Sequence, residues 1–169
     1  MAEDKTDIPK RYAQGQRSFM GIDLEACNLG LQNLAHASFA KANLTNAILH
    51  GATFIGTSFQ QANLQAAGLI SANLSGANLK EANLTNALLT TANLTGADLR
   101  SSILCRAVLT DAILQGANLR DADLRETDFK NADLTGADLS GAKVNLKNLE
   151  DAILNETIFP DGRIVSLEQ

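Results

Sequence analysis

The chain has 169 residues, of which 45% are hydrophobic and 20% are charged, and its formal net charge at pH 7 is −5. This length is enough for one domain with a sizeable core. A mildly acidic chain is a poor ligand for nucleic acid or for an anionic membrane surface, so we expect neither as a direct partner. No apolar run approaches the roughly 20 residues that span a bilayer.

The first 16 residues form a polar segment that precedes the regular part of the chain. They lack the apolar core of a signal peptide, so we expect a cytoplasmic protein. Within this segment Pro9 stands where a first helical turn favours proline, and Gly15 can end the helix. Residues 8–14 are therefore predicted to form a short helical cap.

From Phe19 to Phe159, every fifth residue is large and apolar. These 29 positions hold 22 Leu, six Phe and one Val, and the residue two positions earlier is usually Ala. A period of five fits neither an α-helix nor a long strand, but residues two apart in an extended segment point to one face. The pattern therefore predicts short extended segments that alternate with corners, with Ala and Leu inside.

Glycines indicate how many units make one coil. Spaced by 20, and each two residues after an apolar position, are Gly56, Gly76, Gly96, Gly116 and Gly136. Four units per coil place them all at one corner. Type II turns need positive φ at their third residue, which favours Gly and then Asn. Eight Gly and three Asn occupy the corner positions, so we expect type II turns at many corners and looser turns at the others.

Units such as Ala82-Asn83-Leu84-Thr85-Asn86 resemble those of pentapeptide repeat proteins. The resemblance covers about residues 17–161 and implies an all-β fold, a right-handed quadrilateral β-helix of about seven coils, roughly 35 Å long at strand spacing. Residues 11–19 and 158–162 are similar to the flanks of cyanobacterial members. The predicted organisation is a polar segment with a helical cap at 1–16, the β-helix at 17–161 and a C-terminal tail at 162–169.

Stacking by 20 makes further predictions about single columns. An aromatic stack is predicted for Phe19, Phe39 and Phe59, and an amide ladder between coils for Asn43, Asn63 and Asn83. Leu31 and Leu146 stand where a polar turn residue belongs. We interpret Leu31–Leu34 and Leu146–Leu149 as local distortions of the coil.

Candidate catalytic and metal-binding groups are sparse. His36 and His50 lie on different sides without Cys or acid at a ligand spacing, and are interpreted as solvated surface residues. Cys27 and Cys105 are about four coils, roughly 19 Å, apart, which is too far for a disulfide. No phosphate-binding loop or nucleophile motif is present. We therefore expect no enzyme, no catalytic residue, no cofactor and no metal.

Some pentapeptide repeat proteins imitate duplex DNA and bind topoisomerases. The resemblance thus implies an alternative function, a DNA-mimic regulator of a topoisomerase or of another nucleic-acid-binding protein. Such mimicry needs negative charge along the rod. Here residues 42–79 contain no Asp, Glu, Lys or Arg, and 13 of the 19 acids lie between Asp98 and Glu168. Because Arg and Lys are interleaved with the acids of residues 121–138, we interpret this run as a self-compensated solvated face.

The residue before each inward Leu is expected to point outward, and it is usually Asn, Asp or Ser. On one side of the coil the corresponding residues are Ile48, Gly68, Leu88 and Val108. Ile70 is expected beside this column, and Ile103 and Ile113 on the flanking sides. Scattered exposed apolar residues need no explanation, but alignment on one side favours a contact surface.

The candidate contact surface consists of Ile48, Ile70, Leu88, Val108 and Ile113. The sequence thus predicts a non-enzymatic binding or scaffold module that presents a rigid rod to a protein partner. A second copy packed side by side, as a homodimer, is one such partner.

Overall fold

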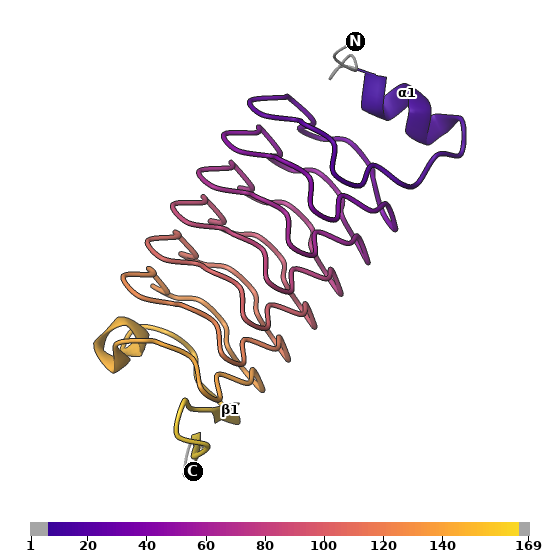
Figure 1. Cartoon of the computed structure of the whole chain (residues 1–169). Coiled ribbons are helices and arrows are strands. Elements are labelled where there is room, and N and C mark those ends of the chain that lie inside the picture. The colour runs from indigo at the N-terminus through magenta and orange to yellow at the C-terminus, as the bar shows by residue number, and fades with distance from the viewer. Residues whose placement is uncertain (1–6, 166–169) are drawn as a thin grey trace.

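The structure is a computed structural model and describes residues 7–165. Over this range the chain winds as a stack of coils between a helix at one end and a small hairpin at the other (Figure 1). Its named elements are helix α1 (Ile8–Ala13), the 3₁₀ helix η2 (Leu146–Leu149) and strands β1 (Thr157–Ile158) and β2 (Ile164–Val165). β1 and β2 pair antiparallel. Among the residues described, no helix is both long and apolar enough to cross a membrane.

The coils stack with a period of 20 residues. Parallel backbone bridges join residues 20 apart, from Ser18 with Ser38 to Asp138 with Ile158. Because each unit has five residues, this register places four units in each coil. The predicted β-helical solenoid is confirmed, and its segments are single bridges rather than long strands.

A unit with an outward Asn or Asp uses all five of its backbone N–H groups in hydrogen bonds. In the unit around Leu94, the N–H groups of Asn93, Leu94 and Gly96 donate to carbonyl oxygens of neighbouring coils at 2.9, 2.7 and 2.9 Å. The N–H of Ala97 donates across the corner to the Leu94 carbonyl at 3.0 Å. The fifth N–H, that of Thr95, donates to Oδ1 of Asn93 at 3.0 Å. An outward Asn or Asp therefore completes the hydrogen bonding of its own unit.

The corner residues share one backbone conformation. From Gly21 to Gly141, every residue two positions after an inward Leu or Phe has positive φ, including Leu31 (61°) and Arg106 (58°). The prediction of looser turns at corners without Gly or Asn is wrong. A left-handed conformation costs an ordinary residue roughly 1–2 kcal/mol. The hydrogen bonds to the neighbouring coils impose it all the same.

The interior holds the predicted Leu, Phe and Ala side chains. The inward Leu and Phe residues from Phe19 to Leu139 are at most 2% exposed. The predicted aromatic stack is confirmed, with ring centroids 5.2 Å apart between Phe19 and Phe39 and 5.6 Å apart between Phe39 and Phe59. An inward Thr is also satisfied, since the hydroxyl of Thr127 donates to the Leu104 carbonyl at 2.8 Å.

Only one of the two predicted distortions is present. Residues Leu146–Leu149 form η2, where Oδ1 of Asn145 accepts the Lys147 N–H at 3.1 Å. Leu31 instead occupies an ordinary corner, is 83% exposed, and is followed by an intact bridge from Asn33 to Thr53. A corner side chain points away from the core, so an apolar residue there leaves the coil undisturbed.

The two ends of the coil stack are covered differently. At the N-terminal end, Ile8 of α1 is fully buried and the Tyr12 hydroxyl donates to the Ala35 carbonyl at 2.8 Å. At the C-terminal end, Val144 and Phe159 are only partly buried and border an apolar pocket of about 190 Å³. The core is thus closed more completely at the end that carries α1.

Candidate functional site

The predicted contact residues lie on one side of the coil and its edge. Parallel bridges join Ile48 to Gly68, Gly68 to Leu88, and Leu88 to Val108, so these four residues form one column. Ile48 is 43% exposed and Leu88 is 42% exposed, whereas Val108 is half-buried. We use the name stripe for Ile48, Ile70, Leu88, Val108 and Ile113.

Two members of the stripe stand beside the column. Ile70 follows Gly68 by two residues, at the edge of the same side, and is 37% exposed. Ile113 belongs to the neighbouring column, where bridges join it to Asn93 and Asp133, and is 39% exposed. The stripe therefore has three residues in one column and two displaced toward the neighbouring side.

The outward residues of this column cannot make the hydrogen bond that Asn or Asp makes elsewhere. Ile, Leu and Val have no side-chain oxygen to accept the N–H of the residue two positions later. In the neighbouring column, Asn73 and Asn93 accept this N–H at 3.1 and 3.0 Å. An apolar residue at such a position gives up a bond of the fold.

Gly68 interrupts the column, and His50 of the preceding coil covers it. Nδ1 of His50 accepts the Ile70 N–H at 3.2 Å, which is the N–H that an outward Asn at position 68 would otherwise accept. A Cβ atom on Gly68 would overlap Cε1 of the imidazole, so glycine makes room for the ring.

His50 is a partly exposed surface residue, and it also makes a contact that the sequence interpretation did not include. The residue is half-buried and holds a defined hydrogen bond within the stripe. Its signal in the sequence is a glycine in an outward position with a histidine 18 residues before it. His36 lies in a similar way against Gly56, where its ring atoms leave no room for a Cβ.

The column of Asn43, Asn63 and Asn83 does not use its amide oxygens to join coils. Oδ1 of each residue accepts the N–H two positions later, at 3.2, 3.2 and 3.0 Å. The predicted amide ladder is wrong for these oxygens, because the unit's own fifth N–H takes them. The amide nitrogen of Asn43 does donate to Asp23 of the preceding coil at 3.1 Å.

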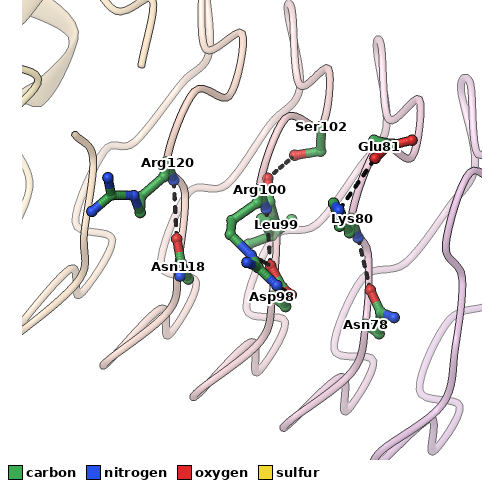
Figure 2. A network of polar contacts seen from close by, with 9 residues as sticks. All are labelled: Asn78, Lys80, Glu81, Asp98, Leu99, Arg100, Ser102, Asn118 and Arg120. Atoms are coloured by element: carbon green, nitrogen blue, oxygen red, sulfur yellow. Dashed lines mark hydrogen bonds and ion pairs between the residues drawn. The ribbon is translucent and has the colours of Figure 1, made fainter. Parts of the chain in front are cut away.

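Charged side chains of the C-terminal coils pair with one another. Figure 2 shows Lys80, Arg100 and Arg120 at the same corner of successive coils. Arg100 donates twice to Asp98, at 2.8 and 2.6 Å, and Arg125 donates to Asp123 at the same two distances. The predicted self-compensation of the acids in residues 121–138 is confirmed for Asp123, which pairs with Arg125, and for Asp138, which pairs with Arg120 at 3.3 Å. The hydrogen bonds from Arg125 hold the pKa of Asp123 below its usual range although burial raises it.

Metal-binding side chains do not converge in the part of the chain that the structure describes. Between residues 7 and 165, no group of three or more His, Cys, Asp and Glu residues could hold a metal ion. Cys27 and Cys105 form no disulfide, and burial raises the pKa of Cys105. A polar pocket of about 350 Å³ beside η2 is lined by side chains of both charges, including Glu126, Lys130 and Lys147.

Solved structures of similar architecture are known. The chain is 29% identical to a pentapeptide repeat protein of the Arabidopsis thaliana thylakoid lumen, over 71% of this chain and 70% of that chain, with a TM-score of 0.53. HetL, a pentapeptide repeat protein involved in heterocyst differentiation regulation from the cyanobacterium Nostoc sp. strain PCC 7120, is 28% identical, covering 95% and 98% of the two chains with a TM-score of 0.37. Several similar structures come from cyanobacteria.

A third similar structure is trypsin-treated QnrB1, a plasmid-mediated fluoroquinolone resistance protein. It is 20% identical over 82% of this chain and 85% of that chain, with a TM-score of 0.58, and this supports the fold alone. No curated protein gives a significant match. The family model of pentapeptide repeats matches in eight copies, at residues 18–54, 27–65, 67–104, 102–141 and 132–161. Because these matches extend over most of the chain, it belongs to the pentapeptide repeat family.

Proposed function

We propose that this chain is a non-enzymatic binding or scaffold module, which presents the stripe of a rigid rod to a protein partner. One observation carries the proposal. Ile48, Leu88 and Val108 occupy a single bridged column at positions where an outward Asn or Asp would add a hydrogen bond to the fold. The apolar side chains give up this hydrogen bond, and they offer a partner apolar area.

The proposal assumes a right-handed quadrilateral coil of about seven turns at strand spacing, with α1 as its N-terminal cap. The usual right-handed connection of parallel strands supports this hand. The complete burial of Ile8 and the hydrogen bond from Tyr12 support the capping role of α1. Such a rod has few internal motions to lose when it binds, which favours a well-ordered contact.

Burial of the stripe would supply useful binding energy. Covering a Leu or Ile side chain fully is worth roughly 1.5–3 kcal/mol, and these residues are already partly buried, so each would contribute less. Contacts of a few clustered side chains commonly carry most of the energy of a protein interface. The five residues of the stripe form such a small cluster. Residues 42–79, around its first half, carry no Asp, Glu, Lys or Arg that would have to be desolvated.

The alternative, mimicry of duplex DNA, has less support. Mimicry needs regularly placed negative charge, yet the middle of the chain has none and Asp98 and Asp123 are paired with arginines. A metal-dependent enzymatic role has no group of metal-binding side chains among residues 7–165 to support it. Protein contact is the function that the described surface supports best.

The stripe can be tested with substitutions that the repeat itself tolerates. A Leu88→Asp, Val108→Asp double variant places the ordinary outward residue of the family in both units, so it should fold and regain two N–H acceptors. The matched control is Asn73→Asp, Asn93→Asp, which adds the same charge on the neighbouring side. Each protein would be immobilised and exposed to an extract of the source organism.

The parent and the control variant are expected to retain the same protein, and the Leu88→Asp, Val108→Asp variant to lose it. Circular dichroism and thermal unfolding would establish that all three chains are folded. Retention of the same protein by all three chains would refute a role for the stripe in binding.

A further inference from the structure

The stripe and the charges around it also indicate which partner the chain binds. We propose that the stripe binds a second copy of this chain, with the two rods side by side and antiparallel. This inference rests on the proposed function and adds the identity and orientation of the partner to it. Three properties carry the inference: the distribution of charge, the order of side chains in the column, and the area of one side.

The charge of the chain is divided unevenly along its length. Residues 1–79 contain five basic and five acidic residues, whereas residues 80–169 contain nine basic and 14 acidic residues, so the whole net charge of −5 belongs to the second part. Parallel rods would bring two acidic parts together within about one Debye length, roughly 8–10 Å. Antiparallel rods place the acidic part of each copy against the neutral part of the other.

The same preference holds within the column. Its next bridged residues are Asn28 before Ile48 and Asp128 after Val108. A parallel pair sets Asp128 against Asp128 of the second copy. An antiparallel pair centred between Gly68 and Leu88 sets Asp128 against Asn28, which removes this repulsion.

This antiparallel register also matches side chains by size. It places Leu88 of one copy against Gly68 of the other, where the His50 ring stands in place of a side chain. It places Ile48 against the smaller Val108. A parallel pair would instead bring Leu88 onto Leu88 and the His50 ring of one copy onto the His50 ring of the other, so that the largest groups meet at the same levels.

One side of the rod is large enough for a stable pair. The accessible surface of the chain is 8108 Å², so its four sides average at most about 2000 Å² each. A stable interface takes about 800 Å² from each partner. The contact is self-complementary, so it closes as a dimer and does not continue into a fibre.

Thiol cross-linking distinguishes the two orientations. Two single variants, Ile48→Cys and Val108→Cys, would each be made in a Cys105→Ser background, with the buried Cys27 retained. Facing β surfaces lie about 10 Å apart, beyond the reach of a disulfide, so a short bismaleimide is the suitable reagent. The antiparallel pair predicts severalfold more cross-linked dimer in the mixture of the two variants than in either variant alone.

Light scattering gives an independent measurement. The parent chain is expected at twice 17.9 kDa, the Leu88→Asp, Val108→Asp variant at 17.9 kDa, and the Asn73→Asp, Asn93→Asp control at the parental mass. If Ile48→Cys alone cross-links as efficiently as the mixture of the two variants, the antiparallel orientation is overturned. If the parent chain is monomeric and the captured protein is still lost in the Leu88→Asp, Val108→Asp variant, the second-copy inference is overturned. The proposed function would then still stand.

Discussion

Residues 42–79 and residues 80–143 follow the same backbone with very different surfaces. Both segments have buried Ala and Leu inside, positive φ at each corner and the same bridges between residues 20 apart. The first segment carries no Asp, Glu, Lys or Arg, whereas the second holds most of the charged residues of the repeat. Two surfaces on one backbone indicate that the inward and corner positions determine the fold.

This comparison separates two kinds of position. Inward residues face a narrow interior that both segments share, so their substitution should have equal effects in the two. Outward residues face solvent, and their chemistry is open to the requirements of binding. Predictions that pair one position in each segment can therefore test whether the division is correct.

The largest effect is expected from overfilling the interior. Ala72→Leu in the charge-free segment and Ala132→Leu in the charged segment both replace an Ala that is at most 1% exposed. Each should lower the free energy of unfolding by roughly 1–3 kcal/mol, since a close-packed core has no room for the added carbons. Urea denaturation measures both losses. A loss in one segment only would contradict the shared interior.

A smaller effect is expected at the glycine corner. Gly76 and Gly116 have φ of 62° and 63°, and an added Cβ would meet no atom within 4 Å at either position. Alanine should therefore destabilise by the backbone strain alone, roughly 1 kcal/mol at each site. Thermal unfolding of Gly76→Ala and Gly116→Ala measures it. No change in either variant would mean that the neighbouring coils hold the corner without strain.

Low pH is expected to lower the stability of the protein through the ion pairs of residues 80–143. Hydrogen bonds from Arg100 and Arg125 lower the pKa of Asp98 and of Asp123 in the folded state. The stability from these pairs is therefore complete above the ordinary Asp pKa of about 4 and is lost as the pH falls through the lower folded values. Melting temperatures between pH 7 and pH 2 should fall less in Asp123→Asn than in the parent. An equal fall would show that other groups govern acid sensitivity.

The smallest effect is expected from a charge placed on the charge-free segment. Oδ1 of Asn73 accepts from the N–H and the hydroxyl of Ser75, at 3.1 and 2.7 Å, and an Asp carboxylate can accept both. Asn73→Asp should change the free energy of unfolding by less than about 0.5 kcal/mol, as is usual for surface substitutions. A loss above 1 kcal/mol by urea denaturation would show that the absence of charge serves the fold.

The periodic features of the fold were predictable because each repeats many times. The inward Leu residues, the Phe19–Phe39–Phe59 stack and the glycine corner all follow from counting by five and by 20. The family membership was predictable for the same reason.

Features that depend on neighbouring coils were harder to predict. Leu31 and Leu146 stand in nearly identical four-residue sequences, yet only Leu146 begins a 3₁₀ helix. The coil that follows Leu31 imposes the corner there, because the Leu31 N–H donates to the His50 carbonyl of that coil at 2.9 Å. Leu146 lies near the last coil, where fewer such bonds are available. The hydrogen bond of His50 to Ile70 depends on a pair of residues in different coils, which no single repeat unit contains.

The 20-residue register has a consequence for changes in chain length. Deleting one five-residue unit would leave every later Leu inside, because the inward position recurs every five residues. A deletion between Ile48 and Leu88 would also move every later residue one side round the coil, so that these two residues would no longer share a column. Deleting a whole coil would keep all four sides aligned. Length variation by single units can therefore create new surfaces in this protein while its core stays the same.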